Sequence, residues 1–285
     1  MLGSDNNFLG RPRVDCLVHW VDGGAYPRFD QACVAEFPKT GPLMPPMTRF
    51  GHVAVSGMTR YRSKEFGPEY RDNVFTTLFN THKVARSVVT RDGATFRTTE
   101  HEFLVSDDPD FHPTDVLEDA DGSLLVIDTG GWFRIGCPVS KVAKPDIHGA
   151  IYRIRRKGAH KVKDPRGRFL DAARLTPAAL ARHLDDARPV VRERVIDRLA
   201  LAGIDAIGTL EDVLAERSAE SLTRRVSAVW SLSRIDKEAS LGPLRAALAD
   251  PAAEVRVAAS RSLGTRGDHQ AMPQLIGLLT GDKSS

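Results

Sequence analysis

Residues 241–264 read LGPLRAALADPAAEVRVAASRSLG, and this stretch decides the fold of the C-terminal half. Leu244 and Leu248 are four residues apart, so they share one face of a helix. Arg256 lies seven residues before Leu263, which places both on one face of a second helix. The stretch therefore predicts two helices joined by a short turn.

The same spacing recurs from residue 175 to residue 285. Pairs of leucines four residues apart recur at intervals of 30, 34 and 31 residues, and an arginine seven residues before a leucine follows each of the first three pairs. Helix pairs that each bury one face stack into an α-solenoid, so we predict three helix pairs and one further helix over 175–285. We expect the arginines to reach helix C-termini or carboxylates of adjacent repeats. The leucine pairs are Leu180/Leu184, Leu210/Leu214, Leu244/Leu248 and Leu275/Leu279, and the arginines are Arg192, Arg225 and Arg256.

The N-terminal half has a different composition. Of the 19 aromatic residues, 18 precede residue 171 and only Trp230 follows it, whereas residues 171–285 contain 21 Ala and 16 Leu. Aromatic residues favour strands, and Ala and Leu favour helix. The composition therefore predicts a β domain followed by an α domain.

Two segments of this half read as strands separated by tight turns. Runs at 73–79 and 83–89 are followed by a turn at Asp92-Gly93, and runs at 114–118 and 123–128 flank Asp121-Gly122. Short strands at this spacing predict an antiparallel meander, and four strands per 45–60 residues match a propeller blade. The predicted fold class is thus β plus α multidomain: a partial β-propeller of about three blades over 1–157, a basic linker over 158–174, and the α-solenoid.

Charge and composition limit the classes of protein. The 285 residues carry 40 Lys and Arg against 37 Asp and Glu, a formal charge of +3, with 27% charged and 41% hydrophobic residues. These values predict a globular chain without a membrane-spanning segment. The first residues show neither a basic start nor an apolar core, so we expect no export signal and a cytoplasmic location.

Cysteine spacing gives no sign of a metal or haem site. Cys16, Cys33 and Cys137 form neither a CxxC pair nor a CxxCH box. We interpret them as free thiols and predict no metal ligands.

Several motifs resemble one family. They include 61–73, Asn80-Thr81-His82-Lys83-Val84, 103–108, 111–116, 128–132, 136–138 and 149–156. This set resembles the exported propeller proteins known as membrane-bound dehydrogenases, or PVC-type haem-binding proteins, over about residues 45–285. In that family a six-bladed propeller similar to glucose/sorbosone dehydrogenases precedes HEAT repeats and, usually, a c-type haem domain.

The resemblance implies HEAT repeats here, an exported or periplasmic location, and an electron acceptor such as pyrroloquinoline quinone or haem, with calcium as a further cofactor in an intact member. No cofactor signature is evident in this chain itself. About three blades and no CxxCH indicate a C-terminal fragment. Because an open arc leaves blade flanks uncovered, we expect a second copy or a protein partner, and a carbohydrate is a further candidate ligand.

Candidate catalytic residues lie where a strand of a blade would enter the channel. His112 and Asp115 lie at one such strand start, and His52 lies in the matching place one blade earlier. A histidine with a carboxylate three residues on can serve as an oriented general base. The alternative is that His112 and Asp115 fix a turn between blades.

Candidate cofactor-binding residues follow other strands. Asp128 and Trp132 end a strand with an acid and an aromatic that could hold a planar ligand, although Trp132 could equally pack between blades. Asn80 and His82 lie between two strands, where the alternative to a channel-facing role is a turn.

Three charged segments, two acidic and one basic, are best interpreted as solvated surface. Asp107, Asp108 and Asp110, and separately the 118–122 turn, could suit calcium, but neither has a defined ligand spacing. Eight Lys or Arg between Arg153 and Arg168 could bind nucleic acid, but we see no aromatic left to stack a base, and we predict no nucleic-acid partner. The sequence thus leaves two functions: a binding scaffold, which we favour for this chain alone, and half of a quinone- or haem-linked sugar or alcohol dehydrogenase.

Overall fold

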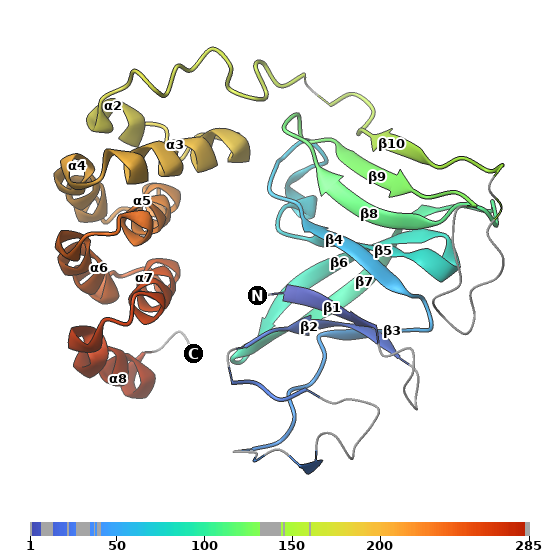
Figure 1. The fold of residues 1–285 in the computed structure, drawn as a ribbon, viewed down its shortest axis with the longest axis horizontal. Coiled ribbons are helices and arrows are strands. Elements are labelled where there is room, and N and C mark those ends of the chain that lie inside the picture. Colours follow the sequence, from blue (N-terminus) through green and yellow to red (C-terminus); the bar gives the residue numbers. More distant parts are fainter. Residues whose placement is uncertain are drawn as a thin grey trace. The chain divides into compact units, whose positions relative to one another are not determined.

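The computed structural model describes residues 2–6, 14–21, 23–26, 35–36, 38, 41–131, 144, 146–159 and 161–282. The chain divides into two compact units, one up to Lys161 and one from Val162 (Figure 1). The first consists of β-sheets and the second of helices, which confirms the predicted order of the two classes of structure. The predicted limits at residues 157 and 175 stay a prediction.

The first unit, here called the β unit, contains three antiparallel sheets within the described ranges. The first has the strand order β1-β2-β3, the second β4-β5-β6-β7 and the third β10-β9-β8. The strands are β1 (Leu2–Asn6), β2 (Asp15–His19), β3 (Thr48–Gly51), β4 (Val55–Arg60), β5 (Val74–Leu78), β6 (Lys83–Asp92), β7 (Thr95–Val105), β8 (Pro113–Glu118), β9 (Leu124–Asp128) and β10 (Ala150–Ile154).

The tight turns lie where the sequence predicts them. Strands β6 and β7 pair up to Asp92 and Thr95, and Gly93 between them has a φ of 58°. Gly122, between β8 and β9, has a φ of 75°, a conformation that glycine adopts without strain. The sequential pairing β4-β5-β6-β7 confirms the predicted antiparallel meander.

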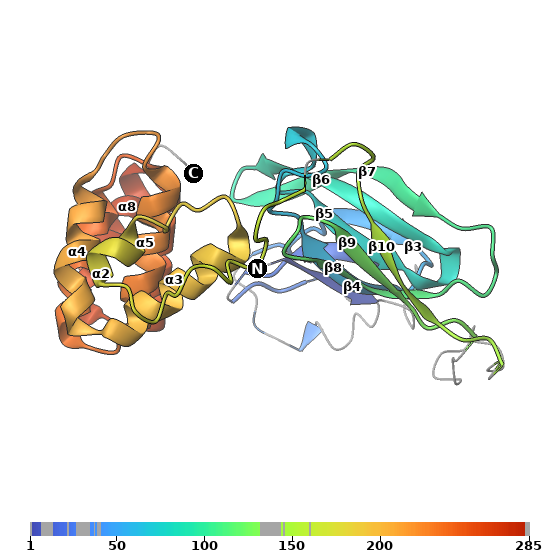
Figure 2. The ribbon, with the colours of Figure 1, turned by 90° about the horizontal axis from the view of Figure 1, so that it is seen from above.

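The sheets pack through their first strands and through apolar side chains. Strand β4 contacts both β1 and β8, and both Figure 1 and Figure 2 show β8 beside β4. One buried cluster joins the second and third sheets, and a smaller one joins the first and second. The larger cluster contains Tyr61, Phe66, Phe75, Val84, Phe111, Val116, Leu124 and Val126, and the smaller contains Leu17, Met47 and Val74.

The second unit, here called the solenoid, contains seven α-helices within the described ranges. Helices α3, α5 and α7 lie side by side, and α4, α6 and α8 form a second row (Figure 1). The helices are α2 (Pro177–Ala181), α3 (Pro189–Ala202), α4 (Ile204–Ala215), α5 (Leu222–Arg234), α6 (Leu241–Ala246), α7 (Ala253–Thr265) and α8 (Met272–Gly281).

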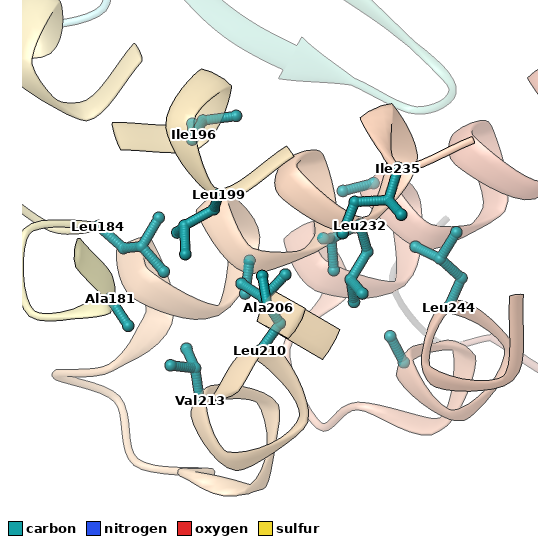
Figure 3. Packing of buried hydrophobic residues seen from close by; sticks show 14 of the residues in the cluster. Ala181, Leu184, Ile196, Leu199, Ala206, Leu210, Val213, Leu232, Ile235 and Leu244 are labelled. Carbon is teal, nitrogen blue, oxygen red and sulfur yellow. The ribbon is translucent and has the colours of Figure 1, made fainter. Parts of the chain in front are cut away.

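The predicted leucines form a continuous core between these rows. Leu210 of α4, Leu244 of α6 and Leu184, which follows α2, point towards Leu199 of α3 and Leu232 of α5 (Figure 3). All five side chains are fully buried. Because each layer buries the face of the next, the core confirms the predicted stacked helix pairs.

Arg225 and Arg256 connect one repeat to the next. Arg225 of α5 forms a buried ion pair with Asp250, which precedes α7. Arg256 of α7 binds Asp282, which follows α8, through Nε and Nη2 at 2.7 Å each. These contacts confirm the expected arginine–carboxylate links between repeats.

Helix α8 departs from the predicted pairing of Leu275 with Leu279. Leu279 is 86% exposed, whereas Leu275 and Leu278 pack against the solenoid core. The apolar face of α8 is therefore an i, i+3 pair instead of the expected i, i+4 pair. In the described part of the chain, the helices all fall short of the length and apolarity needed to cross a bilayer.

Part of the segment predicted as a linker is packed against α3. Arg194 of α3 donates to the carbonyl oxygens of Gly167 and Arg166, both at 2.8 Å. The Asp164 carboxylate accepts from the backbone N–H groups of Arg168 and Phe169. These residues thus extend the solenoid ahead of its first helix.

Candidate functional site

Four segments of the β unit meet at one edge of the second and third sheets. They are residues 52–54 before β4, 79–82 after β5, 110–112 before β8 and 128–130 at the end of β9, together called the loop edge. In antiparallel sheets the start of one strand and the end of the next lie at the same edge. The backbone N–H groups of Phe79 and Asn80 donate to the carbonyls of Ala54 and Val53, at 3.1 and 2.9 Å. The loop edge carries His52, Asn80, His82, His112 and Asp128, five of the residues that the sequence singles out.

His52 lies on a loop that a buried carboxylate holds in place. The Asp15 side chain, 1% exposed, accepts from the N–H groups of Val53 and Ala54 at 2.9 and 2.6 Å. Ala54 has a φ of 51°, which is strained for a residue with a Cβ, so these bonds stabilise an unusual backbone. The imidazole of His52 is exposed. The sequence reasoning missed Asp15, although an acid beside the apolar run of 16–18 is a sign of a buried anchor.

His112 is oriented by backbone carbonyls. Its Nδ1 lies 2.8 Å from the carbonyl oxygen of Gly130 and 3.0 Å from that of Asp110. Carbonyl oxygens only accept hydrogen bonds, so Nδ1 carries the proton and the lone pair of the neutral ring is on Nε2. The side chain is half-buried, with the ring of Phe79 at a centroid distance of 4.7 Å.

His82 has the same kind of anchor. Its Nδ1 donates to the carbonyl oxygen of Phe111 at 2.6 Å. The His82 backbone is left-handed, with φ 56° and ψ 39°, at the end of the short 3-10 helix Phe79–Thr81. The two imidazole rings are in contact, with centroids 5.3 Å apart and an interplanar angle of 68°. The structure therefore brings two predicted site residues together as a pair.

Asp128 binds the backbone of the loop edge through its carboxylate. Its side chain is almost fully buried, and Oδ1 accepts from the backbone N–H groups of His112 and Gly130, both at 2.8 Å. Because Oδ1 is used by the backbone, Asp128 fixes the segment that orients His112. This geometry gives the carboxylate a positioning role, and ligand binding by Asp128 stays a prediction.

Asp115 does not form the hydrogen bond to His112 that one of the two sequence-based interpretations requires. Its Oδ1 accepts from the N–H of Val116 at 2.8 Å, and its side chain lies against Gly57 of β4, where even a methyl group would overlap it. His112, which directly precedes β8, is instead oriented by the carbonyls of Asp110 and Gly130. The catalytic assignments of His112, Asp115 and His52 stay predictions, as does cofactor binding by Asn80, whose side chain is exposed. Trp132 lies outside the described residues.

Two arginines form ion pairs with the carboxylates of the acidic turn between β8 and β9. Arg153 Nη1 lies 2.7 Å from Asp119 Oδ2 and 3.3 Å from Asp121 Oδ1, and Arg155 Nη2 lies 2.9 Å from Asp121 Oδ2. Burial opposes ionisation of Asp121, but bonds from Ser123 and Arg155 and the charge of Arg153 outweigh it, so its pKa falls from 3.8 to about 2. The turn thus does not fit calcium, since its carboxylates already bind guanidinium groups.

The described residues contain no group of three or more His, Cys, Asp or Glu side chains placed to hold a metal ion. Cys16 is buried, and Cys33 and Cys137 lie outside the described ranges. Part of the basic cluster is also used internally, because Arg156 donates to the carbonyl of Phe66 at 2.9 Å.

Comparisons with known proteins match each unit separately. Residues 44–158 match a domain of unknown function, DUF7133, and residues 210–285 match HEAT repeats, which confirms the predicted repeat class. No curated protein matches the chain. Among solved structures, the chain is similar to an oxidoreductase from Thermus thermophilus described as a glucose dehydrogenase, with 14% identity and a TM-score of 0.36. The similarity covers 53% of this chain and 40% of that protein, so the chain spans less than half of its length.

Proposed function

We propose that this chain is a binding scaffold whose HEAT solenoid presents the outward face of α3, α5 and α7 to a protein partner. The carrying observation is a row of equivalent, at least partly exposed positions on the neighbouring helices α5 and α7. Arg225 and Arg256 occupy matching positions, so the residues that follow them, Val226 and Val257, also match. Trp230 and Arg261 match in the same way.

The middle of this face has the composition of an interface centre. Val257 is 57% exposed, and Val226 and Trp230 are only partly buried. Arg261 is exposed and forms no ion pair with any other described residue. Tryptophan and arginine are enriched among the residues that dominate binding energies, so an apolar segment that carries a carboxylate fits this face.

Two variants with equal starting exposure test the proposal. Val257 on α7 and Ile276 on α8 are 57% and 55% exposed. The full chain and the variants Val257→Asp and Ile276→Asp are used as baits in affinity purification with quantitative mass spectrometry. We expect Val257→Asp to lose a partner that wild type and Ile276→Asp retain, and identical partner sets for all three baits would contradict the proposal.

We further propose that the β unit is an arc of about three propeller blades that belongs to the PVC-type family. A second copy or a protein partner covers the flanks of this arc. A carbohydrate is a candidate ligand. Contacts of β4 with β1 and β8 support it, since the first strands of adjacent blades are neighbours in a propeller. Size-exclusion chromatography with light scattering tests the covered flanks. A compact monomer that melts cooperatively would contradict the proposal that another chain covers the flanks.

The alternative is that this chain is one half of a dehydrogenase. The Nδ1-protonated tautomer of His112 favours this alternative. With Nδ1–H bound by carbonyls, Nε2 can accept a proton from a sugar or alcohol hydroxyl group. The chain is reconstituted with pyrroloquinoline quinone and calcium, and dye reduction is measured across a sugar panel. Turnover that His112→Gln abolishes would support this function, and no turnover with any sugar by this chain combined with the missing half of the propeller would contradict it.

A further inference from the structure

Two histidines of the loop edge each have one ring nitrogen fixed and the other unused. Nδ1 of His82 and Nδ1 of His112 both donate to backbone carbonyls. Neither Nε2 makes a hydrogen bond to any described residue. Each neutral ring therefore offers an Nε2 lone pair.

This arrangement is the one found around histidines that bind metals. A metal-ligating imidazole almost always donates its other N–H to a carbonyl or a carboxylate, which fixes the tautomer and the direction of the ring. Here two rings in contact share that feature. A single histidine with such a bond is ordinary, whereas His82 and His112 are in contact and both have it.

The spacing of the rings fits a shared ion. With a metal–nitrogen distance of about 2.0–2.1 Å and a tetrahedral angle, two imidazoles bound through Nε2 have ring centroids about 5.2 Å apart. The observed distance between the centroids of His82 and His112 is 5.3 Å. Their interplanar angle of 68° shows that the two rings are not stacked face to face.

The backbone of His82 is strained in the conformation that produces this contact. Left-handed conformations are unfavourable for residues with a Cβ and cluster at functional sites. The carbonyl oxygen of His82 accepts from the N–H of Ser106 at 3.0 Å, and the ring is tied to Phe111. The chain thus holds the imidazole beside His112 despite this cost.

Nearby carboxylates already have partners. Asp110 Oδ1 lies 2.6 Å from Lys144 Nζ, and Asp128 Oδ1 accepts from two backbone N–H groups. An ion at this place would thus have two protein ligands and open positions for water or a small ligand. Open positions are typical of catalytic sites and not of structural zinc sites.

We propose that Nε2 of His82 and Nε2 of His112 together bind one divalent ion of the zinc or copper type. Imidazole nitrogen suits these ions, whereas calcium and magnesium require oxygen ligands. The proposal is independent of the scaffold function. It excludes proton acceptance by His112 in the same molecule, because the metal would take the lone pair that a base needs.

Zinc titration of the untagged full chain by calorimetry tests the site. We compare wild type with His82→Asn, His112→Gln and the control His101→Gln, an exposed histidine on β7. Asparagine tolerates the left-handed backbone of position 82. We expect one zinc ion per wild-type chain and at least about tenfold weaker binding in the first two variants, since loss of even an outer partner costs that much. His101→Gln should bind as wild type does.

A second measurement on the wild-type chain does not depend on the folding of variants. Long-range nitrogen-15 spectra of the histidine rings should show two Nε2 signals shifting together on addition of zinc, while their Nδ1 signals stay protonated. Zinc binding that survives in both variants, or Nε2 signals of His82 and His112 that do not move, would overturn the proposal.

Discussion

The two units of this protein are stabilised in different ways. The solenoid has one continuous buried cluster running from Ala172 to Ala271, built from side chains of adjacent helices. The β unit has three smaller clusters and relies on polar side chains that bind backbone far away in sequence, such as Asp15 and Glu118. Repetition lets helices form a core from near neighbours, whereas three sheets need individual long-range contacts.

The polar contacts therefore have different tasks in the two units. In the solenoid, Arg225 and Asp250 link repeats that are already packed. In the β unit, Glu118 accepts from the backbone of Arg62 and Ser63 at 3.0 and 2.7 Å and so sets the position of the segment before β5. The following predictions test this difference in the full chain by hydrogen-exchange mass spectrometry, which follows the two units separately.

Removing the buried arginine should have the largest effect. Arg225→Ala leaves the Asp250 carboxylate buried without its partner, which typically costs about 3–5 kcal/mol. We expect a loss of exchange protection in α5 to α7 and a lower urea midpoint for the solenoid, with the β unit unchanged. The double variant Arg225→Met with Asp250→Asn removes both charges and should recover part of the loss. A β unit that loosens equally would contradict independent units.

Tyr61→Phe should have the next largest effect, in the β unit. The fully buried Tyr61 hydroxyl donates to the carbonyl of Gly122 at 2.8 Å and accepts from the N–H of Phe66 at 3.1 Å. Burial also raises the pKa of this phenol well above its usual value, so it stays protonated. Each buried backbone group left unpaired costs about 1–3 kcal/mol, and the loss is measured as faster exchange in β8 and β9. Unchanged exchange there would show that water replaces the hydroxyl.

Acid should weaken the β unit through Asp121. Its pKa is about 2 in the folded chain against 3.8 for the free side chain, so its ionised form stabilises the fold above pH 3.8. That contribution is lost as the pH falls towards 2. Asp121→Asn should therefore flatten the decline of β-unit stability between pH 4 and pH 2, measured by urea unfolding at several pH values. An equal decline in wild type and variant would assign the acid sensitivity to other carboxylates.

Breaking an exposed ion pair should have the smallest effect. Arg234 and Asp197 lie 2.8 Å apart on α5 and α3, with side chains 50% and 63% exposed. Solvent and salt screen such pairs, so Arg234→Ala should change solenoid stability by about 0–1 kcal/mol. A change as large as that of Arg225→Ala would contradict the distinction between buried and exposed pairs.

The sequence predicts the solenoid in more detail than it predicts the site. Leucines and arginines at fixed intervals identify α3, α5 and α7, since each helix follows a local period. The exception is Leu279, whose spacing on α8 does not reveal which face is covered.

At the loop edge, the sequence identifies residues but not their partners. His82 and His112 are both singled out, yet their contact joins positions 30 residues apart and depends on how two sheets pack. Likewise, nothing in the acidic turn around Asp121 indicates that Arg153 of β10 and Arg155, just after β10, bind it. Such partners depend on strand register and are not visible in a local pattern.

The sequence by itself determined the order of β and α structure, the repeat length of the solenoid and the turns at Gly93 and Gly122, because these follow from local periodicity and backbone freedom. Tertiary structure alone decided that carbonyls orient His112, that Asp15 holds the loop of His52 and that Arg225 is buried beside Asp250. Those contacts arise only when distant segments pack, since hydrogen-bond direction and burial are properties of the folded chain.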